Sequence, residues 1–276
     1  MPAILNSRDI GYLKDRAREM RVEILKMLEK SGSGHTGGSL SAADIVAALY
    51  FCKIKHRPHN PDWAGRDRFI LSKGHAAPVL YTALALTGYF DKSLLNSLRK
   101  IGCPLQGHPS SKLLNGVEIS TGSLGQGLSI ANGIAMGLRL DKSDARVYCL
   151  LGDGEIQEGQ VWEAAMSASH YRLDNLCAIV DHNGLQIDGK CCDVMNIEPV
   201  AEKWKAFGWH AISINGHDMQ EIVNAFDEAE KIKGKPCMIV AKTIKGKGVS
   251  IFEDKVEYHG ITPTKEELEI AIKELA

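Results

Sequence analysis

The chain has 276 residues, of which 44% are hydrophobic and 24% are charged, as is usual for a folded globular protein. Lysine and arginine number 33 against 34 aspartates and glutamates, and this balance gives no electrostatic reason to expect nucleic acid or an anionic membrane as a partner. The first residues lack the apolar core of a secretory signal, and no stretch approaches the roughly 18 apolar residues of a membrane span. We therefore expect a cytoplasmic protein.

Helical and strand-like segments alternate along the chain. Helical patterns lie at 8–29, 40–50, 76–87, 128–140, 159–170, 200–207, 219–231 and 265–275. Continuous apolar runs, which are typical of buried parallel strands, lie at 68–72, 146–152, 175–181, 209–214 and 237–243. This alternation predicts an α/β fold with a doubly wound, mostly parallel sheet flanked by helices. No linker interrupts it, so we expect residues 1–276 to form one domain with a peripheral helix at about 265–275.

Two short polar segments follow neighbouring predicted strands. Gly152, Asp153 and Gly154 follow the run at 146–152, and Asn183 follows the run at 175–181. A lone Gly-Asp-Gly is often only a tight turn, but residues 155–182 are enough for one strand–helix–strand crossover. Adjacent parallel strands would then place Asp153 and Asn183 at one edge of the sheet, where such folds bind ligands. A carboxylate, an amide oxygen and a loop carbonyl suit Mg2+ or Ca2+, and the helix beginning at 159 favours a diphosphate there.

These residues resemble a known family. Gly-Asp-Gly followed by a crossover and an asparagine is similar to the thiamine diphosphate motif, and LGDGEIQEGQVWEA and VDHNGLQIDG resemble transketolases in particular. The resemblance implies a thiamine diphosphate-binding fold in which Asp153, Asn183 and the carbonyl of Leu185 bind the metal. It also implies that residues 152–154 and Glu155 contact the cofactor diphosphate. Glu158 matches a family glutamate that contacts the catalytic glutamate of the partner.

Three further segments supply histidines. SGSGHTGGSLSAADI, RDRFILSKGHAAPVLY and LQGHPS resemble family signatures and contain His35, His75 and His108. KTIKGKGVSIFEDKVEYHG resembles the loop that closes over the cofactor and ends near His259. Each of the four adjoins a glycine in a predicted loop, where the backbone can approach a ligand. By resemblance they hold the transferred unit and relay protons, and His75 and His259 also contact the cofactor.

Two more loops complete the predicted cofactor site. STGSLGQGLSIANGIA resembles the family's TGPLGQG loop, with Ser123 in place of the usual proline, and contributes Gly122, Ser123 and Leu124 as cofactor contacts. Lys242 begins a basic stretch, KTIKGKG, that lacks P-loop spacing; either a mobile active-site loop or a plain solvated loop fits it. We assign Lys242 to the cofactor. The other histidines are expected to be structural: His56, His59, His170, His182, His210 and His217.

The resemblance runs from about residue 10 to about residue 262 and covers only the first domain of a transketolase. The family's second α/β domain, with the catalytic glutamate, has no counterpart here, so the chain is either a natural split subunit or a truncation. We favour the N-terminal subunit of a two-plus-two heterotetramer that acts in carbohydrate metabolism, with pentose phosphates as the default substrates. It would move a two-carbon ketol unit from a ketose phosphate to an aldose phosphate, and only with a C-terminal partner subunit.

Two alternatives remain open at this point. The chain could serve another thiamine diphosphate enzyme, similar to deoxyxylulose phosphate synthase or to a 2-oxo acid decarboxylase. It could also be a non-catalytic homologue that acts as a regulatory partner.

Overall fold

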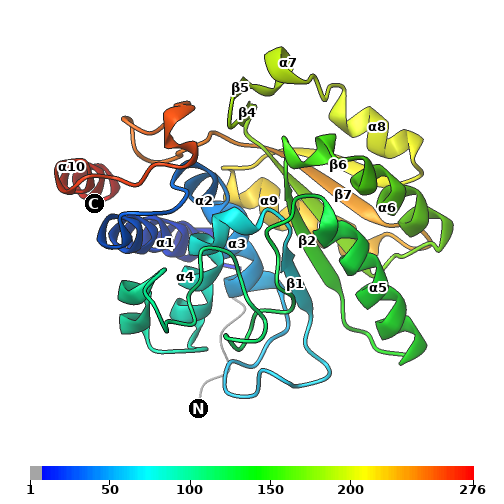
Figure 1. Cartoon of the computed structure of the whole chain (residues 1–276). Coiled ribbons are helices and arrows are strands. Elements are labelled where there is room, and N and C mark those ends of the chain that lie inside the picture. The colour runs from blue at the N-terminus through cyan, green and yellow to red at the C-terminus, as the bar shows by residue number, and fades with distance from the viewer. Residues whose placement is uncertain (1–7) are drawn as a thin grey trace.

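Residues 8–276 are described by the computed structural model, and their centre is a five-stranded sheet of parallel strands (Figure 1). Its order is β1, β2, β3, β7 and β6, with the bounds Arg68–Leu71, Val147–Gly152, Leu176–His182, Cys237–Lys242 and His210–Asn215. All five predicted runs form strands, and no boundary differs from its prediction by more than one residue. The predicted parallel sheet is confirmed.

Helices cover both faces of this sheet (Figure 1). One face carries α1, α3, α4 and α9, with the bounds Ile10–Ser31, Ala43–Ala48, Ala77–Thr87 and Met219–Lys231. The other carries α5, α6 and α8, with the bounds Gln126–Leu140, Gly159–His170 and Val200–Ala206. Successive side chains of β2 alternate between the two layers: Tyr148 and Leu150 pack with the first group, and Cys149 and Leu151 with the second. The doubly wound arrangement is confirmed.

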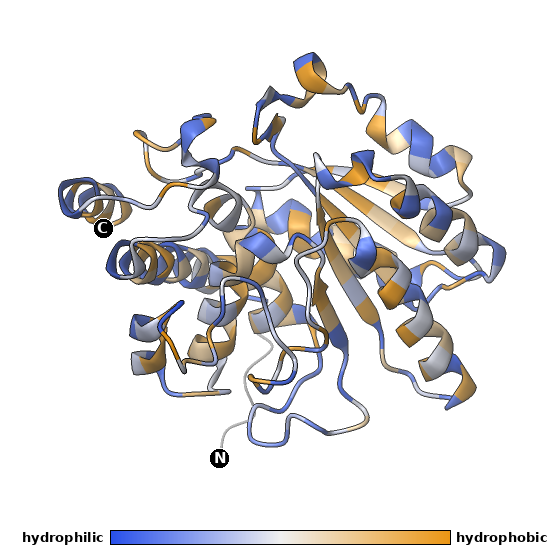
Figure 2. Cartoon of the chain, viewed as in Figure 1, coloured by the Kyte–Doolittle hydropathy of each residue, from blue (hydrophilic) through white to orange (hydrophobic). Residues whose placement is uncertain are grey.

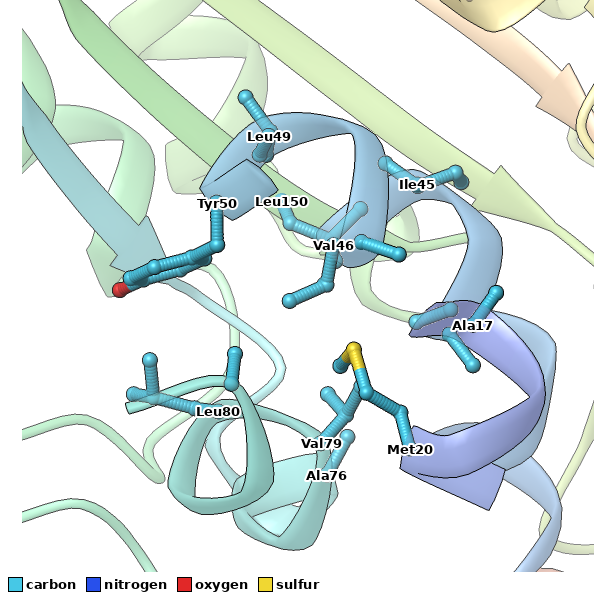
Figure 3. Packing of buried hydrophobic residues seen from close by; sticks show 14 of the residues in the cluster. Ala17, Met20, Ile45, Val46, Leu49, Tyr50, Ala76, Val79, Leu80 and Leu150 are labelled. Atoms are coloured by element: carbon cyan, nitrogen blue, oxygen red, sulfur yellow. The ribbon is translucent and has the colours of Figure 1, made fainter. Parts of the chain in front are cut away.

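The core on the first face is shown in Figure 3. Met20 of α1, Val46 of α3 and Val79 of α4 point toward one another, and Leu150 reaches them from β2. None of these side chains is measurably exposed, and a buried aliphatic side chain contributes roughly 1.5–3 kcal/mol to stability. Figure 2 shows the same pattern over the whole chain, with hydrophobic strands and polar outer faces on the helices.

The segment predicted as one helix over 40–50 is in fact three short pieces, so that prediction is wrong in detail. They are α2, α3 and a π-helical turn, η1, with the bounds Gly37–Ser41, Ala43–Ala48 and Leu49–Lys53. Ala42, with ψ at −6°, ends α2 and interrupts its hydrogen-bond ladder. Every residue from 37 to 53 is buried, so apolar side chains occur on all sides and the periodicity does not reveal the break.

The first and last long helices lie side by side (Figure 1). In α1, Asp9 caps the N-terminus by accepting hydrogen bonds from the backbone of residues 11 and 12. The last helix, α10 (Lys265–Leu275), buries Ala271 and Leu275 in the same core as α1. Arg18 of α1 donates to the carbonyl of Ala276 at 3.1 Å. The predicted C-terminal helix is therefore present, on the outer side of α1.

The carboxyl ends of β1, β2, β3 and β7 meet at one edge of the sheet. A small hairpin and a helical turn follow β3 beyond this edge (Figure 1): β4, β5 and α7, with the bounds Leu185–Gln186, Gly189–Lys190 and Cys191–Val194. Within residues 8–276, no helix is long and apolar enough to cross a bilayer.

Candidate functional site

A pocket of about 350 Å³ opens at the carboxyl edge of the sheet. The predicted site residues that line it come from six separate loops: His35, His75, Gly122, Leu124, Gly152, Asp153, Gly154, Glu155, Glu158, Asn183, Leu185 and His259. Gly38, Lys73, Gln157, Gln186, Ile187 and Lys245 line it as well and were not predicted from the sequence. The structure thus brings together most of the residues that the sequence singled out.

Asp153 and Asn183 lie in the loops that follow β2 and β3, which are adjacent and pair Gly152 with Asp181. The Asp153 carboxylate is 2% exposed and accepts hydrogen bonds from the backbone N–H of Gly154 at 2.8 Å and of Gly184 at 2.5 Å. Asn183 accepts from the backbone N–H of Leu185 at 3.1 Å. The two loops therefore lie next to each other, as predicted from the single crossover, and both side chains accept hydrogen bonds from backbone groups.

Three of the predicted histidines form a cluster beside these loops. The ring centroids of His35 and His75 are 5.0 Å apart, those of His75 and His259 are 5.3 Å apart, and those of His35 and His259 are 5.6 Å apart. The buried Nδ1 atom of His35 has no hydrogen-bond partner among the described residues. A buried ring nitrogen without a partner is unusual in a folded protein, and it points to a ligand in the pocket.

Burial, assisted by neighbouring positive charges, lowers the pKa of all three rings. Burial lowers the pKa of His35 to about 4, with Arg99 adding to the effect, and lowers the pKa of His259 to about 3, with Lys245 adding to it. Burial and then Lys73 hold the pKa of His75 well below its ordinary value. Neutral imidazoles both donate and accept hydrogen bonds, so the cluster is suited to binding hydroxyl groups and moving protons between them.

The lysine that enters the pocket is Lys245 and not the predicted Lys242. Lys242 is exposed and lines a larger, more open pocket of about 770 Å³ behind β6 and β7. Lys245 is 2% exposed, and its ammonium group lies 2.7 Å from Nδ1 of His259 and 3.3 Å from the carbonyl oxygen of Leu185. Burial lowers the pKa of Lys245 to about 8. Since the larger pocket contains none of the other predicted site residues, size alone does not identify the site.

Gly37 makes room for this lysine. A Cβ atom on Gly37 would lie 2.7 Å from Cγ of Lys245 and 3.1 Å from the carbonyl oxygen of Tyr258. Any larger residue at this position would displace the Lys245 side chain or the backbone around Tyr258.

The side chain of Glu155 lines the pocket, and its carboxylate is held by protein groups. Its buried carboxylate accepts hydrogen bonds from the backbone N–H of Gly125 and of Gly152, both at 2.9 Å, and from the hydroxyl of Ser72. Burial raises the pKa of Glu155, although these hydrogen bonds oppose the shift. With its oxygens already bonded, Glu155 ties the Gly-Asp-Gly turn to the loop before α5.

Three other predicted residues lie at the margin of the pocket. His108 and Ser123 are exposed and do not line it, although a Cβ on Gly122 would come within 3.0 Å of the His108 ring. Burial and Arg99 lower the pKa of His108. Glu158 lines the rim of the pocket and is exposed.

A buried ion pair at the base of the pocket, between Lys73 and Asp181, was not predicted from the sequence. Lys73 follows β1 and donates to Asp181 of β3 and, at 2.8 Å, to the carbonyl of Gly38; the lysine is 2% and the aspartate 0% exposed. Asp181 also accepts hydrogen bonds from Ser41 at 2.6 Å and from Thr243. The available signal was a lysine and an aspartate at the carboxyl ends of strands that are otherwise apolar.

His182, expected to be structural, also lies close to the pocket. Its Nε2 atom is 2.8 Å from Glu198, and its Nδ1 atom is 3.6 Å from the Asp153 carboxylate. The Asp153 carboxylate raises the pKa of His182. Burial opposes this shift, and Glu198 adds to it.

Comparison with known proteins agrees with this geometry. Residues 13–275 match the family described as "Transketolase, thiamine diphosphate binding domain". The chain is 47% identical over 263 residues to the 6-deoxy-6-sulfo-D-fructose transketolase subunit SqwG of Clostridium sp. (strain MSTE9), and the match covers 95% of this chain and 96% of that protein. It is 39% identical over 267 residues to one subunit of the apulose-4-phosphate transketolase of Phocaeicola vulgatus, and this match covers 97% and 95%.

Solved structures show the same relationship. The crystal structure of transketolase from Campylobacter jejuni superposes with a TM-score of 0.92 at 39% identity, over 97% of this chain and 43% of that chain. The chain belongs to the transketolase family and matches its thiamine diphosphate-binding domain. It spans less than half of the Campylobacter jejuni transketolase but nearly the full length of the two relatives that are named as subunits.

Proposed function

We propose that this chain is the N-terminal, thiamine diphosphate-binding subunit of a two-subunit transketolase. The enzyme transfers a two-carbon ketol unit from a ketose phosphate to an aldose phosphate. One observation carries the proposal: the Asp153 and Asn183 loops and the three neutral imidazoles of His35, His75 and His259 line one pocket.

The residues present fit a metal-bound diphosphate. Asp153, Asn183 and the carbonyl of Leu185 offer the oxygen donors that Mg2+ or Ca2+ prefers. The carbonyl oxygen of Leu185 points at the ammonium group of Lys245, 3.3 Å away, and this lysine lines the pocket, so the oxygen is directed toward the site. Among the described residues, no three His, Cys, Asp or Glu side chains cluster as a metal site of another kind. Backbone at Gly122, Leu124 and 152–154 would contact the diphosphate.

When bound, thiamine diphosphate supplies the nucleophilic carbon that a two-carbon transfer requires. The protein supplies orientation and proton transfer. His35, His75 and His259 hold the hydroxyl groups of the sugar and exchange protons with them while remaining neutral at pH 7. His108, outside the pocket lining, is assigned to the outer part of the substrate. Lys245 replaces Lys242 as the lysine that faces the cofactor.

A partner chain completes the proposed enzyme. Two relatives of the same extent are named as transketolase subunits, whereas the Campylobacter jejuni enzyme carries more than twice as much chain. We infer that the partner resembles the second half of such an enzyme, that Glu158 meets its catalytic glutamate, and that two copies of each chain assemble. The substrates named for these relatives indicate that the sugar carries an anionic group, either phosphate or sulfonate.

The test is co-expression with an encoded chain that resembles the second half of a transketolase. The purified complex should transfer ketol units only with thiamine diphosphate and Mg2+, and the same complex with Asp153→Asn should not. Donors should include a ketose phosphate and a 6-sulfonated ketose, because the relatives differ in this group. Transfer by this chain alone, or cofactor binding by the complex without transfer from any donor, would contradict the proposal.

A further inference from the structure

Lys245 lies in a segment, 243–248, that leaves β7 and passes beneath the pocket. Residues on both sides of Lys245 in this segment are held by hydrogen bonds to side chains outside the pocket. The Ile244 backbone N–H donates to Nε2 of His217 at 2.8 Å, and the Lys247 carbonyl accepts from Nε of Arg21 at 2.9 Å. The positions on both sides of Lys245 are therefore held by side chains that do not line the pocket themselves.

The hydrogen bonds of His217 determine its protonation. This residue lies in the loop between β6 and α9. A backbone N–H can only donate, so Nε2 is the acceptor in the bond from Ile244. Nδ1 must then carry the proton, and it lies 2.7 Å from Oδ2 of Asp44. His217 is thus a neutral ring, held in one tautomer by a donor on one side and an acceptor on the other.

Asp44 and Arg21 close the connection. Both residues are 7% exposed, and Arg21 of α1 makes two hydrogen bonds to the Asp44 carboxylate, at 3.0 and 2.6 Å. Burial would raise the pKa of Asp44, but Arg21 and His217 outweigh it and lower the pKa to about 2. The contacts run from Ile244 through His217, Asp44 and Arg21 and return to Lys247. This is a closed ring of side chains around the backbone that carries the pocket lysine.

We propose that His217 is a positioning residue, which acts with Asp44 and Arg21 to hold segment 243–248 so that Lys245 faces the pocket between Leu185 and His259. Among the described residues, His217 is the hydrogen-bond acceptor for the Ile244 N–H. The inference rests on the proposed function only where it concerns the cofactor. The placement of Lys245 itself is measurable without any ligand.

Two substitutions separate positioning from general stability. In His217→Gln the side-chain oxygen reaches the place of Nε2 and still accepts from Ile244, but the bond to Asp44 is lost. In His217→Asn the amide nitrogen takes the place of Nδ1 and still donates to Asp44, but the Ile244 N–H is left unpaired. Each variant loses the imidazole and one part-buried hydrogen bond, so a purely structural role predicts similar behaviour for the two.

The primary measurement is the rate at which acetic anhydride modifies Lys245 in the cofactor-free chain, followed by mass spectrometry. We expect His217→Asn to raise this rate about tenfold, the factor that corresponds to one unpaired, part-buried donor, and His217→Gln to stay within about twofold of wild type. Thiamine diphosphate affinity, measured by calorimetry, should follow the same order. The matched control is His210, which lies outside the pocket lining and whose Nε2 atom is 2.6 Å from the Glu228 carboxylate. His210→Asn and His210→Gln should change neither the labelling rate of Lys245 nor the cofactor affinity.

Equal labelling of the Asn and Gln variants, or a faster rate in Gln than in Asn, would overturn the proposal. If wild type binds no thiamine diphosphate while the labelling order holds, the proposed function fails and this inference stands. If neither variant folds, long-range 1H–15N NMR of wild type decides. The spectrum must show His217 as the neutral Nδ1–H tautomer. An imidazolium or an Nε2–H tautomer would refute the proposed positioning role of His217.

Discussion

The carboxylate of Asp153 accepts a hydrogen bond from the backbone N–H of Gly184 at 2.5 Å, which joins the loop after β2 to the loop after β3. The other oxygen of Asp153 accepts from Gly154. Both bonds turn the carboxylate toward the pocket and hold it there before any ligand arrives. Because the carboxylate is already ordered, little binding free energy is lost in ordering it when a ligand binds.

Asp153→Asn should therefore weaken the binding of thiamine diphosphate with Mg2+ by at least about tenfold, because an amide offers one acceptor oxygen where the carboxylate offers two and carries no charge. Calorimetric titration of the isolated chain measures this. Asp188→Asn, at an exposed position in the neighbouring hairpin, is the control and should leave the affinity unchanged. Equal affinities for wild type and Asp153→Asn would show that the metal ion does not bind to this loop.

Glu155→Gln should destabilise the chain without touching a ligand. The amide nitrogen of glutamine cannot accept from Gly125 or Gly152, so one backbone donor is left buried and unpaired. We expect a loss of about 1–3 kcal/mol in the free energy of unfolding, measured with urea. Glu163→Gln, on the exposed face of α6, should change it by less than about 0.5 kcal/mol. A stable Glu155→Gln variant with weakened cofactor binding would instead support the predicted contact between Glu155 and the cofactor diphosphate.

The two lysines of the basic stretch should behave differently. Lys245→Met should weaken thiamine diphosphate binding about tenfold while lowering the free energy of unfolding by no more than about 1 kcal/mol, because removal of a buried ammonium group also removes its desolvation cost. Lys242→Met should leave both quantities at wild-type values, since Lys242 is exposed and lies outside the pocket. The opposite pattern would return the cofactor role to Lys242.

The histidine cluster should make stability depend on pH. Burial lowers the pKa of His35 to about 4 and that of His259 to about 3, from an ordinary value of 6.5. Between pH 6.5 and about 4 the unfolded chain binds protons that the folded chain does not, so the free energy of unfolding falls as the pH falls. Urea midpoints of the cofactor-free chain at a series of pH values measure the slope. His35→Gln with His259→Gln should flatten it, and an unchanged slope would show that these rings titrate normally.

Much of the fold and part of the site could be predicted from local patterns. The strands are continuous apolar runs, and the neighbouring positions of the Asp153 and Asn183 loops follow from the geometry of a single crossover. The direction of Glu155 could not be predicted, because its partners Ser72 and Gly125 come from other loops. The break at Ala42 was equally hidden, since all its neighbours are buried.

For a related reason, the sequence could not show which of the two lysines, Lys242 or Lys245, lines the pocket. Lys242 and Lys245 occupy the same basic stretch, and which one points inward depends on Asp181 and His217, far away along the chain. His217 could have been noticed, because it follows Gly216 just as the predicted site histidines adjoin glycines. Its role in the fold depends on Asp44, and no motif connects the two.

Gly37 and Lys245 share one space, since a Cβ on the glycine would meet the lysine side chain. We therefore expect the residues at these two positions to vary together among homologues. A homologue with alanine or serine at position 37 should carry a smaller or displaced residue at position 245, and a homologue that keeps this lysine should keep the glycine.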